Sequence, residues 1–171
     1  HSKIDEEKFV TDGFGSQRHD LMYNDFILVG PKNDPAQIGT AKTTIEAFQK
    51  IAEAKARFAS RSDDSGTHKA ERRFWQDART TPTDASGKWY LETGLGMGAT
   101  LNFAVQADAY ALTDRATWLT FKNKTTHMPL HQGDPALFNQ YGVVLVSQTH
   151  CPTIKAAESR IFVDWLLSPK G

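Results

Sequence analysis

The chain has 171 residues, with 20 lysines and arginines and 20 aspartates and glutamates, so its formal net charge is zero. This balance gives no electrostatic reason to expect nucleic acid or an acidic membrane surface as a partner. The single cysteine, Cys151, excludes an internal disulfide and a cysteine-based zinc site, and the length is sufficient to bury a core.

The first third of the chain combines helical and extended patterns. Ile4–Val10 reads as a short amphipathic helix, and Phe14–His19 is expected to form a loop. Phe26–Val29 is a compact apolar run between turn residues, which is typical of a buried strand. Thr40–Ala56 is the clearest amphipathic helix, and its apolar stripe predicts that it covers a sheet.

The same alternation continues to the end of the chain. Further strands are predicted at Phe58–Ala59, Lys88–Leu91, Tyr110–Leu112, Met128–Leu130 and Val143–Val146, and further helices at Gly66–Ala78, at Leu101–Ala107, from Asp114 onwards and at Ile154–Leu166. Short strands alternating with helices argue for an α/β fold with helices on the faces of a sheet. In such folds ligands bind beyond the strand ends, at the starts of the helices.

One strand-to-helix connection is dense in groups that could bind an anion. Ser65 is a good N-cap residue for the predicted helix, whose free first amides carry partial positive charge. Ser60, Ser65 and Thr67 add hydroxyl donors, and Arg61 adds a planar guanidinium. Gly66 allows a ligand to approach the backbone closely. The alternative interpretation is a well-capped connection without a ligand, since these are ordinary loop residues.

Arg115 lies at a second junction of the same kind, directly after the strand that ends near Asp114. In a parallel sheet both junctions would emerge at one edge, so Arg61 and Arg115 could converge on one ligand. Two guanidinium groups would balance the charge of a dianion in a poorly hydrated cleft. The alternative is that Arg115 forms an ion pair with Asp114 or Asp63 and only braces the loop.

The glycine-rich stretch Gly94–Gly98 raises the question of a dinucleotide site. Its spacing does not match Gly-x-Gly-x-x-Gly, so the sequence argues against that site. We expect these glycines to allow close helix–strand packing or to face a cleft. No other cofactor is indicated.

The same loop also contains residue types used in enzymatic and metal sites. Ser65, His68 and Asp63 or Asp64 are the residue types of a hydrolytic triad, but no Gly-x-Ser-x-Gly elbow is present. A metal site built from Asp63, Asp64 and His68 is disfavoured, because the aspartates are better used as caps and loop braces. The sequence therefore predicts a binding protein and not an enzyme.

Several motifs in order resemble one family. Ser60–His68 reads Ser-Arg-Ser-Asp-Asp-Ser-Gly-Thr-His and resembles the Ser-Arg-Gly-Asp-Asp-Ser-Gly-Thr-His loop of periplasmic tungstate-binding proteins, the solute receptors of ABC importers. Further matching stretches are Met22–Pro31, Trp89–Gly94, Gly96–Leu101, Tyr110–Thr117 and Phe138–Val143. Ser62 replaces the usual glycine, which restricts that turn, and the family's N-terminal part with its Thr/Ser-rich oxyanion loop is absent.

The resemblance implies a type II periplasmic-binding-protein-like architecture of two α/β lobes, one complete and one only partly represented. Residues 1–26 and 148–171 would form part of the first lobe, and 27–147 the second lobe. Phe26–Val29 and Val143–Val146 would be the crossover strands between them. With part of the site missing, this chain alone is expected to bind weakly, and exposed apolar faces would favour a dimer.

The resemblance also implies a function. The chain would bind tungstate, with molybdate, sulfate and phosphate as alternatives, through Ser60, Arg61, Ser65, Gly66, Thr67 and Arg115, and pass it to the membrane permease of an ABC importer. A ligand-sensing domain is a further alternative. The location would be periplasmic or extracellular, with or without a lipid anchor. No apolar run could span a bilayer and no signal peptide is present, so the polar start suggests a processed or truncated chain.

Overall fold

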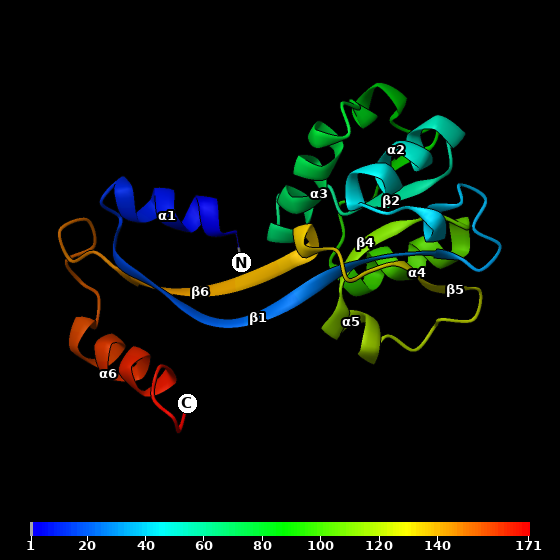
Figure 1. The fold of residues 1–171 in the computed structure, drawn as a ribbon. Coiled ribbons are helices and arrows are strands. Elements are labelled where there is room, and N and C mark those ends of the chain that lie inside the picture. The colour runs from blue at the N-terminus through cyan, green and yellow to red at the C-terminus, as the bar shows by residue number, and fades with distance from the viewer. Residues whose placement is uncertain (1) are drawn as a thin grey trace. The chain divides into compact units, whose positions relative to one another are not determined.

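The computed structural model describes residues 2–171 (Figure 1). It divides into two compact units, one comprising the chain up to Asn24 together with Asn139–Gly171, and one comprising Asp25–Phe138. The sequence predicted the two divisions of the chain after residues 26 and 147, whereas the units divide after Asn24 and Phe138. The assignment of these units to lobes stays a prediction. Within residues 2–171, every helix is too short or too polar to cross a bilayer.

The smaller unit contains two helices and two paired strands. Its elements are α1 (Lys3–Thr11), the first part of β1 (Gly15–Pro31), β6 (Phe138–Val146) and α6 (Ala156–Leu166). Strand β6 pairs with β1. Helix α6 exposes Ile161, Phe162 and Trp165, with 69, 57 and 50% of their surfaces accessible. The dimer expected from such faces stays a prediction.

The expected loop at Phe14–His19 is wrong, because β1 already begins at Gly15. The Ser147 amide donates to the Phe14 carbonyl at 2.8 Å, and the Ser16 hydroxyl donates to the Leu145 carbonyl at 3.4 Å. These partners lie about 130 residues away in the sequence. These polar residues form a strand because a segment distant in the sequence pairs with them. Local sequence patterns do not reveal such pairing.

The larger unit holds the remaining elements. Its helices are α2 (Thr44–Ala54), α3 (Gly66–Asp77), α4 (Met97–Ala107) and α5 (Arg115–Thr120), with 3-10 turns η1 (Ile38–Thr40), η2 (Pro82–Ala85) and η3 (Pro135–Leu137). Its strands are β2 (Phe58–Ser60), β3 (Tyr90–Glu92), β4 (Ala111–Asp114), β5 (His127–His131) and the end of β1. Helix α2 starts four residues later than expected, because the Thr43 side chain caps it by accepting from the Glu46 amide.

Parallel and antiparallel pairing are mixed in this unit. Strands β2 and β3 are parallel, and a parallel bridge between Phe58 and Tyr110 joins β2 to the start of β4. Strand β1 runs antiparallel to both β4 and β5. The carboxyl ends of β2, β3 and β4 therefore meet at one edge, where α3, α4 and α5 begin (Figure 1).

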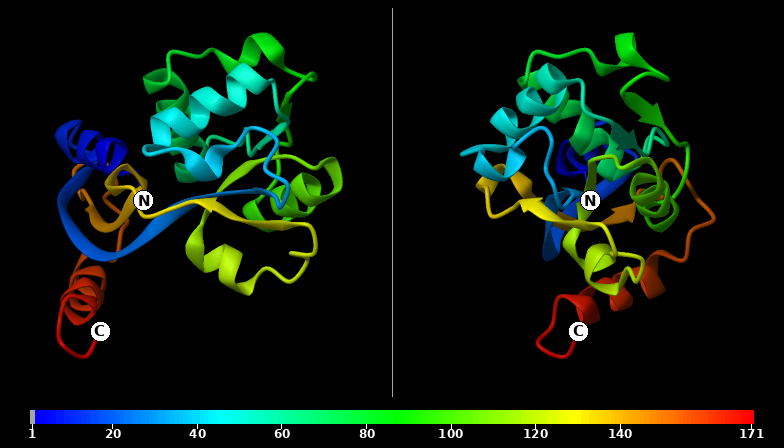
Figure 2. Two further views of the ribbon diagram at one scale, coloured as in Figure 1. Left: turned by 45° about the vertical axis from the view of Figure 1, so that its right-hand side comes forward. Right: turned by 90° about the vertical axis from the view of Figure 1, so that its right-hand side faces the viewer.

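An apolar layer covers each face of the sheet. Successive residues of a strand point alternately into one layer and the other. Phe26 and Leu28 of β1 belong to the cluster that includes Phe48 of α2 and Trp75 of α3. The intervening residues Ile27 and Val29 belong to the cluster that includes Leu101 of α4 and Trp118 of α5. The turned views show α2 and α4 on different sides of the strands (Figure 2). This period of two confirms the predicted buried strand and the α/β class.

Candidate functional site

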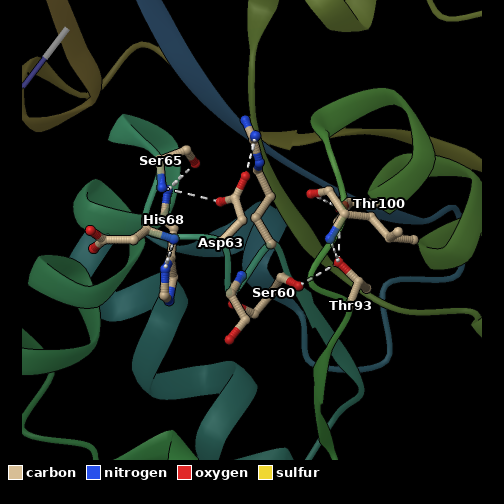
Figure 3. Close-up of polar contacts among 10 residues, drawn as sticks. Ser60, Asp63, Ser65, His68, Thr93 and Thr100 are labelled. Carbon is tan, nitrogen blue, oxygen red and sulfur yellow. Dashed lines mark hydrogen bonds and ion pairs between the residues drawn. The ribbon is translucent and has the colours of Figure 1, made fainter.

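Several donors at the start of α3 have no acceptor among the described residues. The Ser65 hydroxyl accepts from the His68 amide at 3.3 Å and so caps the helix (Figure 3). The amides of Gly66 and Thr67 have no acceptor among residues 2–171. The Thr67 hydroxyl also has no partner among these residues, and the residue as a whole is 2% exposed. The Ser65 amide, in contrast, donates to Asp63 Oδ1 at 3.2 Å and is not free for a ligand.

Arg61 adds a second kind of unused donor. Its Nη2 pairs with Asp63 Oδ2, and its side chain is 17% exposed. Its Nε is buried and has no hydrogen-bond partner in the described part of the chain. Burial by itself would raise the pKa of Asp63, but hydrogen bonds from Ser65 and Arg61 lower it below its ordinary value. Asp63 is therefore ionised at neutral pH and orients the guanidinium without occupying its Nε.

Ser62 sits in a strained position of this loop. Its φ of +47° lies in the left-handed region, which favours glycine. Its hydroxyl donates to Glu92 Oε1 at 3.1 Å, and its amide donates to Ser60 Oγ at 3.2 Å. The glycine-to-serine departure noted in the sequence therefore falls at a position where a side chain has an energetic cost.

Ser60 faces the interior and not the loop surface. It is fully buried, because it lies two residues after Phe58 on the same face of β2. Its hydroxyl donates to Glu71 Oε2 at 2.9 Å. The sequence assigned Ser60 to direct contact with an anion, whereas here its proton is directed at a carboxylate. The sequence predicts no role for Glu71, since a single glutamate on a helix gives no local sign of burial.

The start of α4 lies beside the same loop. Thr93 Oγ1 donates to the Ser60 carbonyl at 2.9 Å and lies 3.0 Å from Thr100 Oγ1 (Figure 3). Gly96 is the N-cap of α4, and no side chain of the part of the chain that the structure describes caps this helix end. A Cβ at Gly94, Gly96 or Gly98 would meet no atom of the described chain within 4 Å beyond its immediate neighbours. Of the two alternatives expected for these glycines, close packing is therefore wrong, and facing a cleft stays a prediction. An uncapped helix start with an open backbone is a second position suited to an anion.

The start of α5 differs from the other two. Asp114 caps it by accepting from the amide and the hydroxyl of Thr117, at 2.8 and 2.7 Å. Arg115 pairs with both carboxylate oxygens of Asp25, at 2.7 and 2.6 Å, and donates to Gln132 at 2.8 Å. The alternative predicted from the sequence was an ion pair with Asp114 or Asp63, and the observed partner is neither. The two junctions are adjacent, but Arg115 is neutralised by Asp25 across the β1–β4 pair.

The arrangement of Ser65 and His68 is not that of a hydrolytic triad. The Ser65 hydroxyl meets the backbone amide of His68 and not its ring. The ring Nδ1 accepts from the Asp64 amide at 3.1 Å. Burial, followed by the charge of Arg72, lowers the pKa of His68, so the ring is neutral at pH 7. No group of three or more His, Cys, Asp or Glu side chains in residues 2–171 is placed to hold a metal ion.

A pocket of about 630 Å³ opens beside the loop. Its lining includes Ser62 of the loop and His68, Arg72, Arg79 and Glu92, but not Arg61, Gly66 or Thr67. It is a competing location for an acidic ligand. Its arginines are exposed, whereas the unused donor of Arg61 is buried.

Known proteins match the chain over its whole length. A family model described as a PBP superfamily domain matches residues 1–170. The tungstate-binding protein TupA of Peptoclostridium acidaminophilum is 43% identical over 173 residues, covering all of this chain and 59% of that protein. The crystal structure of the tungstate ABC transporter from Geobacter sulfurreducens matches with a TM-score of 0.85 and 45% identity, covering 100% of this chain and 72% of that one. TupA from Desulfovibrio alaskensis G20 matches with a TM-score of 0.80 and 39% identity, covering 99% and 68%. The chain thus spans about three fifths of the first relative's length.

Proposed function

Because the chain belongs to the PBP superfamily, we propose that it carries an anion-binding lobe of a solute receptor for tungstate. The observation that carries the proposal is a set of donors without acceptors in residues 2–171: Arg61 Nε, the amides of Gly66 and Thr67, and the Thr67 hydroxyl. An oxyanion supplies only acceptors, so it suits donors that the protein leaves unpaired at the positive end of a helix.

The chemistry is binding without catalysis. Tungstate is a tetrahedral dianion whose oxygens can accept from backbone amides, a hydroxyl and a guanidinium at once. Since the net charge of the chain is zero, the attraction must come from these local groups and from the dipole of α3. Molybdate has the same shape and charge and is the nearest alternative ligand, followed by sulfate and phosphate. No cofactor is needed.

The two arginines have unequal roles in this proposal. Arg61 contacts the anion through its Nε, which is buried here and has to be uncovered by a shift of the loop, and Asp63 holds the guanidinium in place. Arg115 contributes mainly through its field, because Asp25 compensates its charge. Ser60 fixes the loop through its backbone and through Glu71, and a direct contact with the anion would need its side chain to turn.

The named relatives support a role in transport. A receptor of this kind acts in the periplasm or outside the cell, with or without a lipid anchor, and passes its anion to the permease of an ABC importer. The chain is not an enzyme in this proposal. In a dimer, the exposed apolar face of α6 would be buried against the same face of a second copy. Light scattering of the full-length protein tests for this dimer. A ligand-sensing domain would use the same residues.

Calorimetric titration of the full-length protein with tungstate, molybdate, sulfate and phosphate tests the proposal. Tungstate is expected to bind most tightly. Thr67→Val, which removes only the unpaired hydroxyl, is expected to weaken binding by about 1 kcal/mol, which is about fivefold. Thr125→Val is the matched control at an exposed threonine. Absence of heat for all four anions, or equal effects of the two variants, would contradict the proposal.

A further inference from the structure

A buried carboxylate lies directly behind the candidate site. Glu71 belongs to α3 and is only 2% exposed. Among residues 2–171 it forms no ion pair, and all its partners are neutral. Its Oε2 accepts from Ser60 Oγ at 2.9 Å, and its Oε1 accepts from Tyr90 Oη at 2.7 Å and from Trp75 Nε1 at 3.2 Å. An unpaired buried charge is costly, so its presence calls for an explanation.

The three oxygen-bearing side chains form a closed triangle. Tyr90 Oη lies 2.9 Å from Ser60 Oγ, in addition to its 2.7 Å contact with Glu71. With Glu71 ionised, Ser60 and Tyr90 both donate to the carboxylate. With Glu71 protonated, Glu71 donates to Ser60, Ser60 donates to Tyr90, and Tyr90 donates to Glu71 Oε1. Both states satisfy every donor at the observed distances, so the triangle can gain or lose a proton without moving a heavy atom.

The charge of Glu71 matters for a ligand at the start of its helix. Glu71 is five residues after Gly66, so its backbone lies about 8 Å along the helix from that end. At an effective dielectric constant of about 20, a dianion at that end and an ionised Glu71 repel strongly. The repulsion corresponds to a loss of affinity on the order of a hundredfold to a thousandfold. A proton on Glu71 removes this loss.

We propose that Glu71 couples anion binding to the uptake of one proton, so that the site takes a dianion with Glu71 neutral. The proposal rests on the proposed function of the loop. The proton comes from solvent and resides on Glu71 Oε2, where Ser60 Oγ accepts it, and no covalent bond to the ligand forms. Ser60 and Tyr90 are then positioning groups that satisfy Glu71 in both states.

The surroundings of Glu71 favour its protonated form near neutral pH. Burial raises the pKa of Glu71 to about 7, against the opposing effect of its three hydrogen bonds. The charge of Glu92 on β3 raises this pKa further. Burial also raises the pKa of Tyr90, followed by the charge of Glu71, so the phenol stays protonated. Among the described residues, neither α2 nor β2 adds a buried charged group to this environment. The buried residues of α2 are Thr44, Ala47, Phe48 and Ile51, and β2 contributes the Ser60 side chain.

Calorimetry of the full-length protein with tungstate, from about pH 6 to about pH 9 in buffers of different ionisation enthalpy, measures the protons taken up. Above the pKa of Glu71, affinity is expected to fall about tenfold for each pH unit, with about one proton taken up per anion. Glu71→Gln places an amide donor at Ser60 and imitates the protonated acid. It should bind without proton uptake and with a flat pH profile. Asp77→Asn, on the exposed side of the same helix, should keep the wild-type profile.

If the wild type binds tungstate without taking up a proton, or if Glu71→Gln takes up as many protons as the wild type, the inference is wrong. Tungstate binding itself would still stand in both cases. Absence of binding at every pH removes both the inference and the proposed function. If Glu71→Gln does not fold, infrared difference spectroscopy of the wild type decides the question. Tungstate should then produce the carbonyl band of a protonated carboxylic acid at alkaline pH, and a spectrum without that band overturns the inference.

Discussion

Replacing Glu71 by glutamine is expected to change how the stability of the protein depends on pH, even without a ligand. The pKa of Glu71 is about 7 in the folded protein, against an ordinary value of 4.5, chiefly because of burial. A raised folded-state pKa means that the folded protein holds this proton more tightly than the unfolded chain does. The stabilising effect is complete below about pH 4.5 and is lost as the pH rises to about 7.

The gap between these two pKa values corresponds to about 3 kcal/mol of unfolding free energy. Glutamine does not titrate in this range. The unfolding free energy of Glu71→Gln, relative to wild type, should therefore increase by about 3 kcal/mol between pH 4 and pH 8. The two side chains also differ in their hydrogen bonds, which adds a difference in stability that does not depend on pH.

Urea denaturation of the full-length protein at a series of pH values measures this quantity. Tryptophan fluorescence is a suitable signal, since Trp75 is buried and donates to Glu71. Asp77→Asn controls for the loss of one carboxylate from the surface of the same helix. Parallel stability profiles for wild type and Glu71→Gln would refute the reasoning, as would a variant that loses stability relative to wild type as the pH rises.

Three other substitutions have defined outcomes. Arg61→Gln should weaken tungstate binding by about 1.5–3 kcal/mol in calorimetry, and Arg115→Gln by less, because Asp25 already compensates Arg115; equal losses would show that both contact the anion. Ser62→Gly should raise the unfolding free energy by about 1 kcal/mol in urea titrations by relieving a positive φ, and a lower stability would contradict that strain. Phe48→Ala, at a fully buried position, should cost about 3–5 kcal/mol in the same assay, and a cost below about 1 kcal/mol would contradict its place in the core.

Local features of the sequence were sufficient for several elements of the fold. The apolar run Phe26–Val29 predicted a buried strand, and its alternation between two apolar clusters explains why every residue in it is apolar. Ser65 predicted the start of α3 because its hydroxyl accepts from the first turn. These features are set by residues within a few positions of each other.

Contacts between distant residues were not accessible in this way. The first part of β1 has the composition of a loop and becomes a strand through β6. Arg115 was expected to be available for a ligand, but its partner Asp25 lies 90 residues earlier and meets it only through strand pairing. In the sequence Glu71 has no feature that sets it apart from other helix residues. Its burial is apparent only in the structure, where it contacts Ser60 and Tyr90. The donors of the candidate site could be proposed from the sequence, but which of them are unpaired required the structure.

The most direct test of the account is the position of the anion. A crystal of the full-length protein with tungstate, with diffraction measured at a tungsten absorption edge, locates the metal atom by its anomalous signal. We expect the peak at the start of α3, with tungstate oxygens about 3 Å from Arg61 Nε and from the amides of Gly66 and Thr67. A peak in the pocket lined by Arg72 and Arg79, or at neither place, would contradict the account.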